Sequence, residues 1–398
     1  MYRVVVTGIA PIASIGMGES FFDALFSGKT VISRMEPDYC MGEPSTEWYV
    51  PYPKVDIKSY GRDFVKMMMM ASPNACLAAV SAVEALRDSG LEKADEDAAV
   101  YFGVGAPHAG PLLNAYEALG DEAPLHPCTN PMIMSNSVSA WIAMILGIHG
   151  VNQVISTACA SGTNAVGEAY EHIRSGRGRM AVCGGSDDLR SKRGVLMRSF
   201  DVLGALTKSK DGLPRPFSEE RSGFLFSEGG ACALILEEYE SAVKRGADIY
   251  AEITGYSASC DAYHIVQMPE KPVQIVNMLS ELAHGEKVDY YNAHGTATEL
   301  NDKTERYVLG EVFGDAVSEL RVSSTKGLIG HSIGASGAIE AAVCAYSVKN
   351  DIVHGTPTGT SFPELNIPRS SEKARIECAI SASFGFGGHN AALKFKKV

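Results

Sequence analysis

Short apolar runs rich in β-branched residues alternate with small-residue helical segments along the chain, and this alternation constrains the fold most. Buried strands are predicted at residues 4–6, 100–104, 153–157, 180–183, 231–236 and 321–324. Helices are predicted at residues 71–89, 160–175 and 336–349. The first two end in Ser-Gly pairs, which stop a helix. Such alternation predicts layers of helices on a sheet of mostly parallel strands.

One local pattern occurs twice. Residues 155–162 and 323–337 each run from a strand through a turn rich in Gly and Ser into a small-residue helix. This weak internal repeat suggests two related α/β halves that meet near residue 250. We therefore expect an N-terminal half over residues 1–249 and a C-terminal half over residues 250–398. The C-terminal half should close with a β-hairpin formed by residues 376–381 and 391–395.

Composition argues against several classes of protein. The 398 residues include 47 acids and 35 Lys plus Arg, a net charge of −12, so a broad basic face for nucleic acid is not expected. The chain has no 18-residue apolar stretch and no leader-like N-terminus, so neither a membrane span nor a signal peptide is expected. The nine cysteines lack CxxC or zinc-site spacing, which predicts reduced thiols, no metal site and a cytoplasmic location.

Cys159 is the strongest candidate for a nucleophile. It follows a predicted strand, opens a predicted helix and has only small neighbours, Ala158, Ala160, Ser161 and Gly162. A sharp turn between strand and helix needs small residues, and the helix N-terminus offers free N–H groups that favour a thiolate. The alternative is a buried structural cysteine, which we expect for the other eight.

Two histidines and two charged residues are the next candidates. His294 precedes Gly295 and His331 follows Gly330, so a substrate oxygen could approach either ring closely. A structural histidine is the alternative for each. Lys326 lies five residues before His331, and a buried lysine would need a carboxylate partner. Glu305, eleven residues after His294, is the predicted partner, although a solvated glutamate is the simpler reading.

The segment 383–390 alternates aromatic residues with glycine. It reads either as a hairpin turn with two packed rings or as a flexible loop. A flexible loop would present a backbone N–H and an aromatic gate.

Four motifs in this order resemble the β-ketoacyl-acyl-carrier-protein synthases, the elongating condensing enzymes of type II fatty acid and polyketide systems. They are Thr157–Gly162, Asn292–Thr296, Ser324–Lys326 with Gly330-His331, and Gly385–Gly388. The resemblance covers nearly the whole chain. It implies the thiolase-like α/β fold, with two similar βαβαβαββ halves in five layers, α-β-α-β-α.

The resemblance also implies a reaction. Cys159 would take an acyl group from a carrier thioester, and His294 and His331 would hydrogen-bond the malonyl thioester while carbon dioxide leaves. The resulting carbanion would attack the acyl group, in a decarboxylative Claisen condensation. The backbone N–H groups of Cys159 and Phe386 would hold the oxyanion, and Phe386 would be the gate.

A supporting ion pair between Lys326 and Glu305 is implied as well. No metal or organic cofactor is expected, because the phosphopantetheine arm arrives with the acyl carrier protein. The substrate pocket is predicted to include Met132, Ile133, Phe200, Thr296, Thr298 and Phe384.

The docking surface for the acidic carrier protein needs local positive charge. The candidates are Lys58, Arg62, Lys66, Arg198 and Lys208. Fatty-acid relatives often carry Arg or Lys where this chain has Met67–Met70, so a specialised polyketide, polyene or lipid pathway fits at least as well as housekeeping fatty acid synthesis. A homodimer, or a heterodimer with a related synthase-like chain, is expected.

Two other functions compete with this interpretation. A synthase-like subunit that sets chain length in a heterodimer usually lacks the nucleophile, whereas Cys159, His294, Lys326 and His331 are all present here. A thiolase would share the fold but would place a second cysteine near the C-terminal glycine loop, and the nearest here is Cys378.

Overall fold

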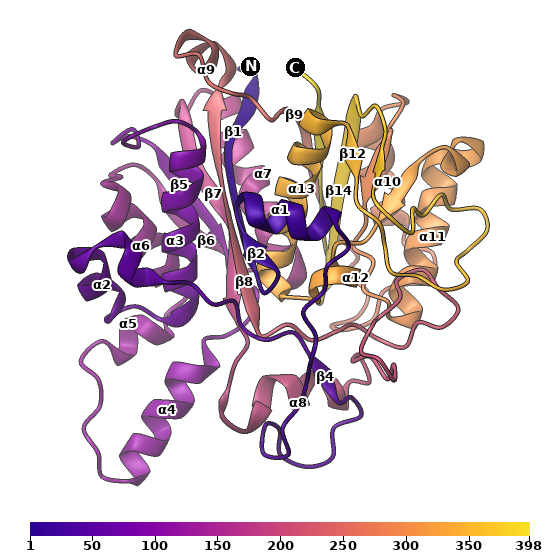
Figure 1. The fold of residues 1–398 in the computed structure, drawn as a ribbon. Coiled ribbons are helices and arrows are strands. Elements are labelled where there is room, and N and C mark those ends of the chain that lie inside the picture. The colour runs from indigo at the N-terminus through magenta and orange to yellow at the C-terminus, as the bar shows by residue number, and fades with distance from the viewer.

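Eleven strands form one mixed sheet in the computed structural model, which describes residues 1–398 (Figure 1). They are β1 (Val4–Ala13), β2 (Gly16–Met17), β5 (Ala99–Gly103), β6 (Asn152–Ile155), β7 (Met180–Asp188), β8 (Gly229–Glu238), β9 (Ala251–Cys260), β10 (Tyr290–Asn292), β11 (Arg321–Ser323), β14 (Cys378–Gly385) and β15 (His389–Lys396). The order is β11-β10-β14-β15-β9-β1-β8-β7-β5-β6, and β2 pairs with β1.

The sheet consists of two sets of five strands with the same arrangement. β6, β5, β7, β8 and β1 form one set, and β11, β10, β14, β15 and β9 form the other. The sets join where β1 pairs with β9, from Val4 opposite Ile253 to Val6 opposite Ala251. The predicted division between residues 249 and 250 falls between the two sets and stays a prediction.

The expectation of mostly parallel strands was wrong. Only β5·β6, β5·β7, β10·β11 and β10·β14 are parallel, and the other pairings in this sheet are antiparallel. Central strands covered on both faces are apolar throughout in either direction, so their sequences do not distinguish the two pairings.

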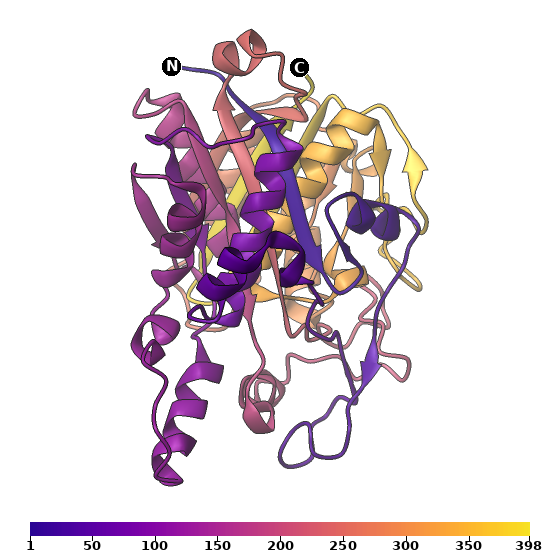
Figure 2. The same ribbon diagram turned by 60° about the vertical axis from the view of Figure 1, so that its left-hand side comes forward.

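Helices cover both outer faces and fill the space between the two sets of strands. α3 (Pro73–Asp88) and α6 (Ser137–Leu146) pack outside the first set, and α10 (Val273–Ala283) packs outside the second beside α11 (Glu299–Phe313). α7 (Ser161–Arg174) and α13 (Ser336–Asn350) pack on each other and contact strands of both sets. This arrangement is the predicted five-layer fold, visible from two directions in Figures 1 and 2.

The predicted elements are present with shifted ends. β1 continues past residue 6 to Ala13, because a bulge between Val6 and Gly8 lets the strand pass through Gly8 and still pair with β8. The predicted helices correspond to α3, α7 and α13, and β14 with β15 forms the predicted C-terminal hairpin.

The remaining α-helices and strands complete the fold. The helices are α1 (Glu19–Phe26), α2 (Arg62–Met68), α4 (Ala109–Gly120), α5 (Thr129–Ile133), α8 (Val195–Val202), α9 (Tyr239–Lys244) and α12 (Lys326–Ile329), and the strands are β3 (Ser33–Arg34), β4 (Trp48–Tyr49), β12 (Ile352–Val353) and β13 (Glu372–Lys373). α4 extends away from the body in both views (Figures 1 and 2). None of the helices combines the length and the apolar character that crossing a bilayer requires.

Candidate active site

Cys159 lies in a tight turn between β6 and α7. The turn is a short 3-10 helix, η2 (Ala158–Ala160), in which Ala158 has a φ of 50°. The backbone N–H of Thr157 donates to Ser161 Oγ at 2.8 Å, which closes the turn. The turn brings Cys159, which is 6% exposed, to the N-terminal end of α7.

A second turn of the same construction precedes α13. It is η5 (Ile333–Ala335), where Ile333 has a φ of 51° and the N–H of Ser332 donates to Ser336 Oγ at 3.1 Å. Ala158 and Ile333 are 333 − 158 = 175 residues apart, as are Ser161 and Ser336. The weak repeat in the sequence therefore corresponds to a repeat in the structure, and Gly334 occupies in the second turn the position that Cys159 occupies in the first.

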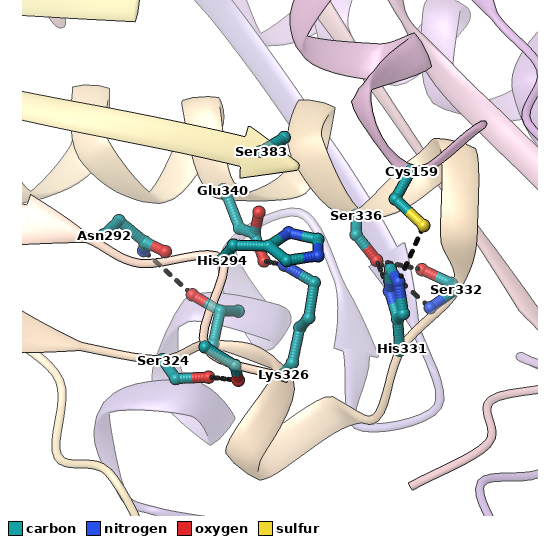
Figure 3. A network of polar contacts seen from close by, with 12 residues as sticks. Cys159, Asn292, His294, Ser324, Lys326, His331, Ser332, Ser336, Glu340 and Ser383 are labelled. Atoms are coloured by element: carbon teal, nitrogen blue, oxygen red, sulfur yellow. Dashed lines mark hydrogen bonds and ion pairs between the residues drawn. The ribbon is translucent and has the colours of Figure 1, made fainter. Parts of the chain in front are cut away.

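His331 faces the cysteine across the gap between the two turns. Its Nε2 lies 3.2 Å from Cys159 Sγ, and its Nδ1 lies 2.9 Å from Ser336 Oγ (Figure 3). Ser336 Oγ accepts the N–H of Ser332, and its own proton has a nearer acceptor in His331 Nδ1 at 2.9 Å than in Ser332 Oγ at 3.3 Å. That assignment puts the ring proton on Nε2, where it can be donated toward Sγ or a substrate oxygen.

His294 comes from the loop after β10 and completes the cluster. Its ring centroid lies 5.6 Å from that of His331 and 5.7 Å from that of Phe384. Its Nδ1 is buried without a hydrogen-bond partner. Burial holds the pKa of both histidines well below its usual range, and the Lys326 charge adds to this effect, so both rings are neutral near pH 7.

The predicted ion pair between Lys326 and Glu305 is not formed. Lys326 Nζ instead lies 2.5 Å from Oε1 of Glu340, and the two side chains are 2% and 1% exposed (Figure 3). Glu340 is on α13, which carries no other acidic residue and is buried on nearly all sides. A lone acid within an Ala-rich helix was the available signal, and the prediction overlooked it.

Glu305 holds the backbone of the His294 loop. Its Oε1 accepts the N–H of His294 at 2.9 Å and the Tyr291 hydroxyl at 3.0 Å, and its Oε2 accepts the N–H of Gly295 at 2.8 Å. Asp302, which the sequence interpretation did not single out, similarly accepts the N–H of Ala297 at 3.1 Å. Glu305 therefore orients His294 through its main chain, and Asp302 holds the same loop three residues later.

The Cys159 thiol does not match the expectation of a resting thiolate. Burial raises its pKa to about 11, while the Lys326 charge and the backbone N–H groups of Phe386 and Cys159 act to lower it. Desolvation outweighs the effect of the helix N-terminus because Cys159 is buried. The N–H groups of Phe386 and Cys159 both lie beside the sulfur, so the carbonyl oxygen of an acyl group on that sulfur can accept from them.

These donors could also suit a soft metal ion. Sγ of Cys159 and one ring nitrogen each of His294 and His331 lie within 4.8 Å of one another. The prediction of a metal-free site stays a prediction.

Comparison with known proteins identifies the family. Residues 1–242 match the family model of the β-ketoacyl synthase N-terminal domain, and residues 250–359 match the C-terminal domain. The chain belongs to the β-ketoacyl synthase family. It is therefore an acyltransferase, and the match of both halves to the β-ketoacyl synthase models sets the thiolase alternative aside.

Named relatives come from both fatty acid and polyketide systems. The synthase is 33% identical to 3-oxoacyl-[acyl-carrier-protein] synthase 2 of Synechocystis sp., over 99% of this chain and 98% of the relative. It is 37% identical to the Staphylococcus aureus protein of the same name, over 80% of each chain. It is 31% identical to putative polyketide beta-ketoacyl synthase 1 of Streptomyces halstedii, over 98% and 97%.

Solved structures agree with the fold. The ishigamide ketosynthase/chain length factor superposes with a TM-score of 0.88 at 28% identity, over 100% of this chain and 99% of that one. A ketosynthase in complex with its type II polyketide acyl carrier protein superposes with a TM-score of 0.86 at 27% identity, over 100% of both.

A narrow cavity of about 100 Å³ adjoins the cluster of Cys159, His294 and His331 in this synthase. Four predicted pocket residues line it together with Cys159, His294, His331 and Phe386; they are Phe200, Thr296, Thr298 and Phe384. The ring centroids of Phe200 and Phe386 are 6.3 Å apart, so the two rings narrow the cavity.

Met132 and Ile133 were predicted to line the same pocket, and neither does. Met132 borders a separate groove of about 760 Å³ beside α4, and Ile133 lines neither hollow. Both residues are on α5, which is tied to the body by a contact between His108 Nδ1 and the Met132 carbonyl at 3.0 Å. A match of sequence positions cannot place such a projecting segment relative to the cavity.

The predicted docking cations differ in availability. Lys58, Arg62, Lys66 and Lys208 are exposed. Arg198 is half-buried, and its guanidinium is already engaged by the Asp201 carboxylate and the Glu43 carbonyl, so it is a poor docking residue. In the methionine run, Met68 is buried but Met69 is 70% exposed, so the run is only partly covered within one chain.

Proposed function

We propose that this synthase condenses an acyl group held on Cys159 with malonyl-acyl-carrier-protein, releasing carbon dioxide and β-ketoacyl-carrier-protein. The supporting observation is the convergence of Cys159 Sγ with ring nitrogens of His294 and His331, all within 4.8 Å, at the cavity below Phe386. A nucleophile and two neutral hydrogen-bond donors at one point suit thioester chemistry.

Acylation is the first half-reaction. The Cys159 sulfur attacks the acyl thioester of the carrier arm, and the N–H groups of Cys159 and Phe386 hold the oxyanion. The carbon–sulfur bond to the arm breaks as the bond to Sγ forms. The departing arm takes up the proton that Cys159 loses, so acyl-Cys159 and a free carrier thiol result.

Decarboxylation and condensation follow. The rings of His294 and His331 donate to the malonyl thioester oxygen, which stabilises the enolate as the carbon–carbon bond to carbon dioxide breaks. Neutral rings fit this role, since each can keep a proton on the nitrogen that faces the substrate. The enolate carbon attacks acyl-Cys159, and the released sulfur recovers a proton from solvent.

The carrier protein is the proposed partner in both half-reactions. A structural neighbour is a ketosynthase in complex with its acyl carrier protein. The hydroxyls of Thr296 and Thr298, 3.0 Å apart at the cavity, suit the amides of a phosphopantetheine arm. We propose no other cofactor, because loss of carbon dioxide drives the reaction without a metal or an organic group.

The pathway is proposed as fatty acid, polyketide or polyene biosynthesis, since the named relatives belong to the first two. A chain-length-determining subunit is less well supported, because the nucleophile and both histidines are present and face one another. We place the protein in the cytoplasm, which its nine free cysteines favour.

We propose that the active form is a dimer. β6 is the last strand of the sheet, and an open edge can pair with another chain. Exposed apolar residues also lie in the part of the chain that precedes β6; they are Met69, Leu112, Tyr116, Leu119, Met134, Met144 and Val151. The second chain is a copy of this one or a related synthase-like chain. Light scattering of the purified protein, alone and with such a chain, distinguishes the two.

The experiment for the main proposal follows intact masses over time. Purified protein is mixed with acyl- and malonyl-carrier protein, with Cys159→Ala as the matched control. Acyl transfer to Cys159 and then a β-ketoacyl carrier extended by two carbons, absent in the variant, are expected from the reaction. Folded protein that accepts no acyl group from any donor would contradict a stand-alone synthase.

A further inference from the structure

A buried carboxylate that the proposed reaction does not use lies between the two turns. Asp187, near the end of β7, is 1% exposed. Its Oδ2 accepts the N–H of Gly334 at 2.6 Å and that of Gly105 at 3.2 Å, and its Oδ1 accepts the N–H of Ala106 at 3.2 Å. Donors from two loops far apart in sequence therefore meet on one side chain.

No cation explains this burial. Arg190, the nearest arginine along the chain, pairs with Asp188 through two contacts, of 2.8 and 3.1 Å. Burial raises the pKa of Asp187 to about 7, although the three N–H groups lower it. A desolvated acid without an ion pair is costly, so its hydrogen bonds have to offset that cost.

The position of Gly334 relates these hydrogen bonds to the reacting cysteine. Gly334 stands in η5 where Cys159 stands in η2. In the first turn the backbone N–H serves the reacting sulfur, whereas in the second turn Asp187 occupies it. The surrounding backbones are in contact: a Cβ on Gly334 would lie 2.3 Å from the Gly105 nitrogen, and one on Gly105 would lie 2.5 Å from the Ala158 carbonyl.

The second turn has a strained backbone and lies close to the His331–Cys159 pair. A φ of 51° is unfavourable for β-branched Ile333, so neighbouring contacts have to hold it. The Ile333 side chain lines the cavity and packs in the same apolar cluster as Cys159. His331 is only two residues earlier. A shift of this turn would therefore change the 3.2 Å separation of His331 and Cys159.

We propose that Asp187 is a positioning residue that clamps the Ile333–Ala335 turn to the Gly105–Ala106 loop and so sets the spacing between His331 and Cys159. The measurement of kcat that tests this role rests on the proposed function, whereas the measurement of Cys159 alkylation does not.

The primary experiment compares Asp187→Asn with Asp188→Asn, a matched change on the next residue of the same strand. Asparagine keeps the size but turns an NH₂ group toward backbone donors. A misplaced catalytic group costs up to about 100-fold in rate. We expect kcat to fall about 10- to 100-fold in Asp187→Asn with KM for malonyl-carrier protein within about twofold, and Asp188→Asn to remain near wild type.

A double variant tests whether Asp187 and Gly334 act through the same contact. Gly334→Ala should disturb the same backbone contact, so its effect and that of Asp187→Asn should be less than multiplicative when combined. Fully multiplicative effects, equal losses in the Asp187 and Asp188 variants, or a lower Tm in Asp187→Asn with unchanged kcat would overturn the positioning role.

The second readout is alkylation of Cys159 by iodoacetamide as a function of pH, followed by peptide mass. The Asp187 charge acts to raise the pKa of the thiol, while Lys326, paired with Glu340, acts to lower it and is retained. Asp187→Asn should therefore react at lower pH, and Asp188→Asn should not. If wild type forms no condensation product, the proposed function fails, and the alkylation profiles alone test the inference. An Asp187→Asn profile that coincides with that of wild type would then overturn it.

Discussion

Lys326 Nζ and Glu340 Oε1 lie 2.5 Å apart, and both side chains are almost completely buried near His294 and His331. The lysine charge acts on both histidines and on Cys159, lowering the pKa of each group. One ion pair between α12 and α13 therefore joins the stability of the core to the protonation of the site.

The first prediction concerns the stability of this pair. Lys326→Met or Glu340→Gln alone should lower the free energy of unfolding by about 3–5 kcal/mol, because each leaves a buried charge without its partner. Lys326→Met combined with Glu340→Leu should recover much of that loss. Urea denaturation measures the free energy of unfolding of each variant. Lys349→Met, which breaks the more exposed pair with Asp248, serves as the control and should cost about 0–1 kcal/mol. A single variant no worse than this control would contradict the prediction.

The second prediction concerns the thiol. Because burial raises the pKa of Cys159 to about 11, its alkylation rate should keep increasing with pH well into the alkaline range. Lys326→Met removes a positive charge that favours the thiolate, so the profile should move to still higher pH. Peptide mapping separates Cys159 from the exposed Cys260. A plateau near neutral pH in the free enzyme would show that the thiolate is the resting form.

The third prediction concerns the histidines. Their pKa values lie well below 6.5, so decarboxylation of malonyl-carrier protein should show no loss from histidine protonation as pH falls to about 6. Removing the Lys326 charge raises both pKa values, so Lys326→Met should begin to lose activity at a higher pH than wild type. The pH–rate profiles of folded protein measure this, and an acid limb near 6.5 in wild type would contradict it.

The fourth prediction concerns the size of the acyl group. The cavity beside Cys159 is about 100 Å³, and Phe200 packs within 6.3 Å of Phe386 and 5.5 Å of Phe224 between ring centroids. Phe200→Ala should increase acylation by long acyl donors relative to short ones by about tenfold. Competition between two acyl-carrier proteins, followed by mass, measures the ratio. Met132→Ala, outside this cavity, is the control and should leave the ratio unchanged.

The sequence predicted much of the site because the local turns depend on local residues. Small residues around Cys159 and glycines beside His294 and His331 mark positions where backbone must turn tightly or approach closely. The alternation of apolar runs and small-residue helices likewise predicted the layers. Such signals remain readable because each depends on a few neighbours along the chain.

The contacts between segments distant in sequence could not be read in this way. Lys326 pairs with Glu340 rather than Glu305 because α13 is packed between the two sets of strands, and Asp187 reaches Gly334 for the same reason. The raised thiol pKa and the separation of Met132 from the cavity also depend on how segments enclose one another. The sequence by itself determined which groups carry the chemistry. Only tertiary packing decided their partners and protonation, because desolvation and hydrogen bonding depend on neighbours in space.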